Sequence, residues 1–157
     1  MIGVSSQVGQ GSTFSIHLPV VENLEPFDDE VLSKSVDGAG CRVLCVDDEA
    51  SIVDVTERLL KRLGFVVTGM TDPVMGAAIF ERAPSDFDVV MVDYFMPKLT
   101  GLELIRKDLP IILSSGNIDE NIRKAAHRDG VEVFLDKPYS NDALSSALQQ
   151  ALASGKE

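Results

Sequence analysis

Five side chains that can bind a metal ion or a phosphate group follow the apolar runs of this sequence. They are Asp47, Asp48, Asp93, Ser115 and Lys137. An apolar run that ends in a polar residue is typical of a buried strand, and the carboxyl ends of parallel strands meet at one edge of a sheet, where ligands bind. We therefore expect these side chains to converge, although 90 positions separate Asp47 from Lys137.

The three carboxylates predict a metal-assisted site. Crowded carboxylates repel one another, and burying them unpaired costs several kcal/mol or raises a pKa. A divalent cation relieves this repulsion, and Mg²⁺ prefers oxygen ligands, including one or two carboxylates together with phosphate oxygens. Lys137 would pair with phosphoryl oxygens as a point charge, and Ser115 could donate to another oxygen, with Gly116 leaving room. These residue types favour a site in which an aspartate accepts a phosphoryl group.

The chain from Cys41 onward alternates between apolar runs and segments of helical periodicity. The predicted strands are Arg42–Val46, Phe65–Met70, Asp88–Val92, Pro110–Leu113 and Glu132–Leu135. The predicted helices are Ala50–Leu63, Pro73–Arg82, Gly101–Lys107, Ile118–Arg128 and Asn141–Ala153. We expect one apolar face on the first helix, formed by Ile52, Val55, Leu59 and Leu60. We also expect Asn141 to cap the last helix. Right-handed crossovers between such strands give a doubly wound α/β fold, a parallel sheet with helices on both faces.

Ordered motifs cover nearly all of this region. They are Val43–Glu49, Val90–Pro97, Gly101–Leu104, Ile111–Gly116 and Phe134–Tyr139. With them, the sequence resembles the receiver domain of two-component response regulators over roughly Cys41 to Ala153. The resemblance implies a flavodoxin-like five-stranded parallel sheet in strand order 2-1-3-4-5, and a module that accepts a phosphoryl group and signals by a conformational change.

The resemblance also assigns roles around the acids. It implies that Asp93 takes the phosphoryl group from a phosphohistidine on a histidine kinase or a histidine phosphotransfer protein. Asp48, Asp93 and the backbone carbonyl of Phe95 would ligate Mg²⁺, and Asp47 would hold a metal-bound water. Lys137 would bind the phosphoryl oxygens, across a Lys137–Pro138 bond that is usually cis in the family. Slow autodephosphorylation of Asp93 is left open.

A hydroxyl group and an aromatic ring form the implied switch. Ser115 would bind a phosphoryl oxygen and move toward it, while the Phe134 ring turns inward to fill the vacated space. The output surface implied by the family lies within Ile118–Ala153, on the fourth helix, the fifth strand and the fifth helix, and would contact a downstream protein.

The third helix departs from the family's usual length. Only eight residues separate Gly101 from Pro110, where the family has about two more helical turns. A parallel crossover needs a dozen or more residues, and the stretch from Asp93 to Pro110 just provides that if the helix has one or two turns. We therefore expect a shortened third helix.

The chain before the receiver-like region falls into two segments. Residues 1–21 predict a short β segment, and Gly9, Gly11 and Phe14 lie in a stretch that looks like the end of a histidine-kinase ATP-binding domain. Residues 22–40 hold six acids against one base, which predicts a flexible acidic linker. This order implies the C-terminal part of a hybrid sensor histidine kinase: remnant 1–21, linker 22–40, receiver 41–153 and tail 154–157. Because the upstream nucleotide-binding elements are absent, we do not expect the chain to be a kinase by itself.

Composition excludes several classes of protein. The formal net charge of −11 argues against nucleic-acid binding, which depends on basic side chains. The apolar runs are too short for a membrane span or a signal peptide. Cys41 and Cys45 would lie too far apart on one strand for a disulfide. We expect a reduced, cytoplasmic protein without direct membrane contact, although a parent kinase could have its own membrane anchor.

Two other functions stay open at this point. One is a receiver-like docking module that is never phosphorylated. The other is a phosphohydrolase with an aspartyl-phosphate intermediate, but such enzymes need a second carboxylate two residues after the nucleophile, where this chain has Phe95.

Overall fold

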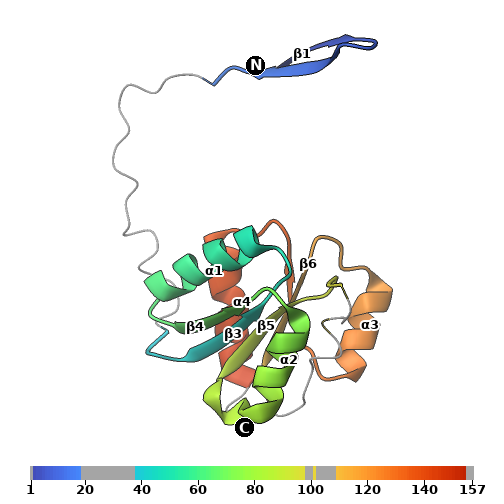
Figure 1. The fold of residues 1–157 in the computed structure, drawn as a ribbon. Helices are drawn as coiled ribbons and strands as arrows, with labels where there is room; N and C mark the ends of the chain where they lie inside the picture. The colour runs from blue at the N-terminus through green and yellow to red at the C-terminus, as the bar shows by residue number, and fades with distance from the viewer. Residues whose placement is uncertain (1, 19–37, 98–100, 102–108, 155–157) are drawn as a thin grey trace. The chain divides into compact units, whose positions relative to one another are not determined.

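The computed structural model describes residues 2–18, 38–97, 101 and 109–154 (Figure 1). The chain divides into two compact units, Met1–Val31 and Leu32–Glu157. Within the described ranges, no helix is long and apolar enough to cross a membrane. Most of the predicted linker 22–40, the predicted third helix after Gly101 and the end of the predicted tail lie outside these residues.

The first unit contains an antiparallel hairpin of β1 (Ile2–Gln7) and β2 (Gly11–Ile16). Its register pairs Ile2 with Ile16 and Val4 with Phe14, so these four side chains lie on one face. All four are at least 66% exposed. A two-stranded hairpin is at best marginally stable in water without a layer against its apolar face. This unit therefore has an apolar face without a covering layer among the described residues.

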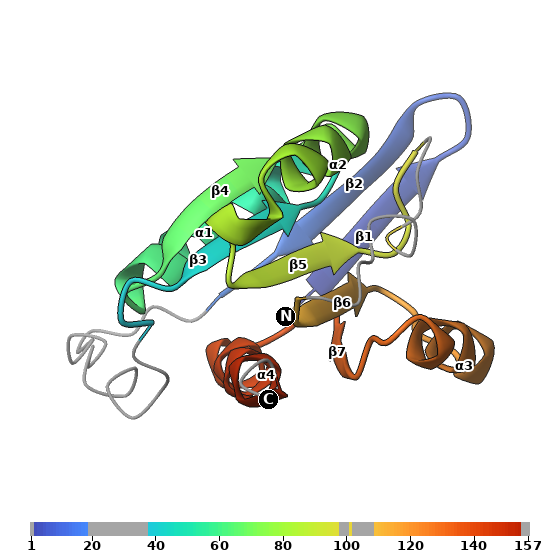
Figure 2. The ribbon, with the colours of Figure 1, turned by 90° about the horizontal axis from the view of Figure 1, so that it is seen from below.

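The second unit is a five-stranded parallel sheet in the order β4-β3-β5-β6-β7 (Figure 2). The strands are β3 (Arg42–Val46), β4 (Val66–Met70), β5 (Val89–Asp93), β6 (Ile111–Ser115) and β7 (Val133–Asp136). Counted from β3, this is the predicted order 2-1-3-4-5, and the doubly wound flavodoxin-like fold is confirmed. The register pairs Val46 with Val92, so the residues that follow β3 lie beside the end of β5.

Helices cover both faces of the sheet and enclose two apolar clusters. The described helices are α1 (Ala50–Arg62), α2 (Pro73–Arg82), α3 (Glu120–Arg128), α4 (Asn141–Ser154) and the short 3₁₀ helix η2 (Pro84–Asp86). Leu60 of α1 and Leu148 of α4 belong to one cluster with Val43, while Phe80 of α2 and Ala126 of α3 belong to the other with Leu44. Neighbouring residues of β3 thus face opposite layers, as they must in a strand buried on both sides.

Some local predictions were wrong. Val55 is 55% exposed, because the buried face of α1 is formed by Val53, Thr56 and Leu60. Ser140 rather than Asn141 caps α4: its Oγ accepts a hydrogen bond from the backbone N–H of Ala143 at 3.2 Å. A serine one position earlier satisfies the same free N–H groups that the prediction gave to the asparagine.

An ion pair joins the amino-terminal ends of β3 and β5. Asp88 accepts hydrogen bonds from the Arg42 backbone N–H at 2.7 Å and from Arg42 Nε and Nη2 at 3.1 and 2.9 Å. These hydrogen bonds lower the pKa of Asp88 below its ordinary value. Both side chains are partly exposed, so solvent screens the pair.

The lowered pKa of Asp88 predicts a pH-dependent contribution to stability. A carboxyl group with a depressed pKa stabilises the fold above its unfolded-state pKa, and this contribution is lost as the pH falls through its folded-state pKa. We expect Asp88→Asn to be less stable than the wild type at about pH 7, with a difference that shrinks toward about pH 3. Urea unfolding at a series of pH values measures this, with the exposed Asp142→Asn as the control. A difference that does not vary with pH would contradict it.

Candidate functional site

Three carboxylates meet at the carboxyl end of β3 and β5. Oxygen atoms of Asp47, Asp48 and Asp93 all lie within 4.8 Å of one another. Asp47 is 3% exposed and Asp93 6% exposed, whereas Asp48 is open to solvent. The Asp47 carboxylate also accepts a hydrogen bond from the Glu49 backbone N–H at 3.0 Å, which fixes the turn into α1. The predicted convergence of these acids is observed.

Lys137 reaches this acidic cluster from the end of β7. Its Nζ donates to Asp47 Oδ2 at 2.5 Å and lies 2.9 Å from Asp93 Oδ1, and its side chain is 15% exposed. The Lys137 backbone N–H donates to the Ser115 carbonyl at 2.8 Å, so β6 supports the residue at the point where the chain leaves the sheet. The next peptide bond, Lys137–Pro138, is cis as expected.

The pKa shifts reflect this crowding. Burial raises the pKa of Asp93 and outweighs the opposing effect of Lys137, while the charges of Asp47 and Asp48 raise it further. Burial by itself would lower the pKa of Lys137, but its hydrogen bonds to Asp47 and Asp93 raise it overall. Lys137 therefore stays charged, and the cluster carries more negative charge than one ammonium group can neutralise. A divalent cation suits such a donor set.

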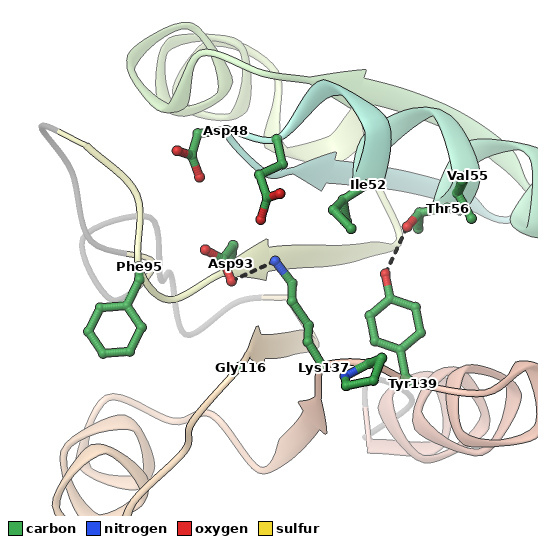
Figure 3. A pocket seen from close by; sticks show the side chains of 11 residues that line it. Asp48, Ile52, Val55, Thr56, Asp93, Phe95, Gly116, Lys137 and Tyr139 are labelled. Carbon is green, nitrogen blue, oxygen red and sulfur yellow. Dashed lines mark hydrogen bonds and ion pairs between the residues drawn. The ribbon is translucent and has the colours of Figure 1, made fainter. Parts of the chain in front are cut away.

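The acidic cluster opens into a cavity of about 720 Å³ (Figure 3). Asp48, Asp93 and Lys137 lie at its polar end. The other lining residues are Glu49, Ile52, Val55, Thr56, Phe95, Gly116, Pro138 and Tyr139. The cavity therefore joins a charged end to a mainly apolar wall formed by α1 and by the loop after β7.

The backbone behind Asp93 is closely packed. Gly101 N–H donates to the Tyr94 carbonyl at 3.2 Å. A Cβ atom at Gly101 would lie 2.5 Å from the Asp93 carbonyl oxygen, a distance that real Cβ atoms do not adopt. Phe95 lies on the far side of Asp93 from Lys137, and its ring is 61% exposed (Figure 3).

The two residues of the predicted switch lie on one face of the sheet. Ser115 ends β6 and is fully buried, and its Oγ accepts a hydrogen bond from the Asn117 N–H at 3.3 Å. Phe134 pairs with Leu113, two residues before Ser115, which puts both side chains on the same side. The Phe134 ring contacts α3, with the Arg123 guanidinium 4.7 Å and the His127 ring 5.1 Å from its centre. Among the described residues, the Ser115 hydroxyl group makes no hydrogen bond to the acids, although Gly116 lines the cavity.

The sequence did not predict one interaction at the cavity wall. Thr56 Oγ1 and the Tyr139 hydroxyl oxygen lie 2.8 Å apart and share a hydrogen bond (Figure 3). The two residues are 83 positions apart, so no local pattern links them. The only sequence signal is a hydroxyl group on the apolar face of α1, which needs a partner once it is buried.

The sequence matches the Response regulator receiver domain family over residues 43–149. The chain belongs to this family. Receiver domains are the phosphoacceptor modules of two-component signalling, so the expected class of protein is confirmed.

Curated relatives include hybrid kinases and transcriptional regulators. The chain is 29% identical to sensor kinase CckA of Brucella abortus, over 94% of this chain and 17% of that protein. It is 30% identical to the kinase/phosphatase LuxQ of Vibrio cholerae, over 93% of this chain and 18% of that protein. For the sensory transduction protein RegX3 of Mycobacterium tuberculosis, the identity is 30% over 72% of this chain and 51% of that protein. The receiver chain thus spans less than a fifth of the two kinases.

Solved receiver structures share the fold. A response regulator receiver domain protein from Clostridium thermocellum superposes with a TM-score of 0.68 at 29% identity, covering 74% of this chain and 97% of its own. The chemotaxis protein CheY4 of Vibrio cholerae gives 0.67 at 28% identity, covering 73% of this chain and 100% of its own.

Removing the ammonium group of Lys137 leaves the acids without a cation, which predicts a large loss of stability. In buffer without divalent metal, we expect Lys137→Met to lower the free energy of unfolding by about 2–3 kcal/mol. Adding Asp93→Asn to this variant removes one like charge and should recover part of the loss. Urea unfolding measures both effects. The control is Lys124→Met, which removes an exposed ion pair with Glu120 and should cost less than about 1 kcal/mol. Equal stability of Lys137→Met and the wild type would contradict this account.

Proposed function

We propose that this receiver domain accepts a phosphoryl group on Asp93, with Mg²⁺ as its cofactor. The observation that carries the proposal is the cluster of three carboxylates closed by Lys137, a residue 90 positions away from Asp47. A structural ion pair needs one acid and one base, whereas this cluster holds excess negative charge beside an open cavity. Excess charge at an open site suits a metal and a phosphoryl group.

The proposed reaction transfers the phosphoryl group from a phosphohistidine to a carboxylate. A carboxylate oxygen of Asp93 forms a bond to phosphorus while the bond between phosphorus and the imidazole nitrogen breaks. The ring nitrogen keeps the electron pair of the broken bond and takes a proton from solvent, which gives neutral imidazole. Asp93 must be ionised to act as the nucleophile. Asp93 is largely buried, and it lines the cavity through which a donor would approach.

Asp48 and Asp93, together with the backbone carbonyl of Phe95, would hold the Mg²⁺ ion, and Asp47 would bind one of its waters. The closeness of the three carboxylates fits this donor set. When bound, the ion supplies positive charge for the transferring phosphoryl oxygens. Lys137 would then exchange its contact with Asp93 for a phosphoryl oxygen, and Ser115 would donate to another oxygen, with Phe134 following as the second half of the switch.

The partners of such a module are a phosphodonor and a downstream protein. A histidine kinase or a phosphotransfer protein would present its phosphohistidine at the cavity, which the exposed side chains of Val55 and Phe95 line together with the acids. The surface formed by α3, β7 and α4 would contact the downstream protein, because Phe134 touches α3 there. This arrangement requires the domain to lie in the cytoplasm. Phosphorylation is favoured over a purely docking role because Lys137 and the acids are already assembled.

The proposed domain order follows the first expectation: kinase remnant 1–21, linker 22–40, receiver 41–153 and tail 154–157. Two observations support a place at the end of a hybrid kinase. The matches to CckA and LuxQ cover at least 93% of the chain, so they extend beyond the receiver, unlike the match to RegX3 at 72%. The hairpin of β1 and β2 also has an exposed apolar face that a preceding domain would cover.

Phosphorylation can be tested with acetyl phosphate and Mg²⁺. We expect the intact mass to rise by one phosphoryl group in the wild type, with no increase in Asp93→Asn, because that variant lacks the nucleophile. Omitting Mg²⁺ should reduce the rate at least about a hundredfold, since the site loses its main charge compensation. The control Asp142→Asn, an exposed acid of α4, should react as the wild type does. Unmodified wild type would favour the docking module, and sustained phosphomonoester hydrolysis would favour the phosphohydrolase.

The hairpin can be tested by amide hydrogen exchange. In the chain as it stands, we expect the amides of β1 and β2 to exchange far faster than those of β5, because a two-stranded hairpin is at best marginally stable by itself. The same amides should be protected in a longer protein that places an ATP-binding domain before the hairpin. Slow exchange in the present chain would contradict the proposed domain order, because the apolar face would then need no preceding domain.

A further inference from the structure

Lys137 follows the strand of the site that has the fewest pairing partners. In the sheet that the structure describes, β7 is an edge strand and pairs with β6 alone. The last sheet hydrogen bond is donated by the Lys137 N–H to the Ser115 carbonyl, and Pro138 has no N–H with which to continue. The long side chain of Lys137 must nevertheless keep its ammonium group between Asp47 and Asp93. A further contact beyond Pro138 would restrict the loop.

Tyr139 provides that contact. Its ring packs against the apolar cluster between the sheet and the layer of α1 and α4, and its hydroxyl group reaches Thr56 of α1 at 2.8 Å. Thr56 is 1% exposed, so its hydroxyl group has little access to solvent. A phenylalanine at position 139 could fill the same apolar space, but it would leave the Thr56 hydroxyl without this partner. The tyrosine hydroxyl group thus has a role that packing does not explain.

The hydrogen bond connects the two segments that carry the charges of the site. α1 begins at Ala50, two residues after Asp48, and Thr56 lies within its second turn. Tyr139 lies two residues after Lys137. The hydrogen bond therefore links α1, which follows the acids, to the loop after β7, which follows Lys137. Burial raises the pKa of Tyr139, so its hydroxyl group stays protonated and the bond persists at neutral pH.

We propose that Thr56 and Tyr139 are positioning residues for phosphoryl transfer: the hydrogen bond between their hydroxyl groups holds the loop after β7 against α1 and so keeps Lys137 at the acidic cluster. This inference rests on the proposed function for its consequence, but its geometric content can be tested without a phosphodonor. Neither residue touches the reacting atoms, and both act through Lys137.

Loss of the bond has opposite effects on two measurable quantities. A freer Lys137 spends less time where phosphoryl oxygens would bind, so transfer from acetyl phosphate slows. The same movement takes positive charge away from the acids, which then bind Mg²⁺ more tightly because a cation competing for them has withdrawn. General loosening of the site would instead weaken Mg²⁺ binding and slow transfer together. The signs of the two changes therefore separate a positioning role from a purely structural one.

The test uses Tyr139→Phe and Thr56→Val in the full chain, each of which removes a hydroxyl group with little change of shape. We expect each variant to be phosphorylated by acetyl phosphate about fivefold more slowly at saturating Mg²⁺. Mg²⁺ measured alone by calorimetry should bind about two- to threefold more tightly. The double variant should match the single variants, since both remove one bond. Thr56→Ser, which retains the hydroxyl group, should restore wild-type behaviour.

A control and a third readout keep the result interpretable. Thr68→Val makes the same chemical change on β4, away from the cavity, and should alter neither quantity. The ammonium protons of Lys137, followed by NMR, should exchange faster with solvent in Tyr139→Phe, which requires neither Mg²⁺ nor a donor. Unchanged exchange and unchanged Mg²⁺ affinity would overturn the positioning role, as would a parallel loss of both metal affinity and rate. If the wild type takes no phosphoryl group, the proposed function fails, while NMR and calorimetry still decide the positioning role.

Discussion

Repulsion among three carboxylates at one sheet edge is the constraint on which the other features of this receiver depend. Asp47 and Asp93 are buried, Asp48 completes the group, and Lys137 is the cation bonded to it. Folding therefore brings like charges close together, and the free energy of apolar packing must offset their repulsion. Burial raises the pKa of Asp93, and the neighbouring charges of Asp47 and Asp48 add to the effect. Such a site is suited to bind a cation together with an anion, because the cation compensates the excess negative charge of the carboxylates.

The sheet holds these charges in place through its register. Val46 lies beside Val92 and Asp93 beside Ser114, so the acids after β3 and at the end of β5 are neighbours by backbone geometry. Ser115 lies beside Asp136, which brings Lys137 to the same edge. Both apolar clusters keep the strands in this register from opposite faces. The distances between the charged groups are thus set mainly by the backbone of the sheet and less by the side chains themselves.

The sequence was sufficient to predict the strand order and the convergence of the three acids and Lys137. Each of these site residues follows an apolar run, and the strands of a parallel sheet all end at the same edge. Helical periodicity was less informative about orientation, and Val55 proved exposed where an apolar face was expected. The bond between Thr56 and Tyr139 was beyond prediction, since it depends on how α1 packs beside the loop after β7. Local patterns determine elements and their ends, whereas contacts across layers need the assembled fold.

The close approach of Gly101 to the Asp93 carbonyl restricts the backbone on the Asp93 side of the site more than on the Lys137 side. The backbone of Asp93 is closely packed against Gly101, whereas the Lys137 ammonium group is carried by a four-carbon side chain at the end of an edge strand of the described sheet. Any adjustment to a ligand of different size must then come from rotation about the lysine's side-chain bonds. The position of Asp93 is thus set by the backbone, whereas the position of the Lys137 ammonium group also depends on the conformation of its side chain.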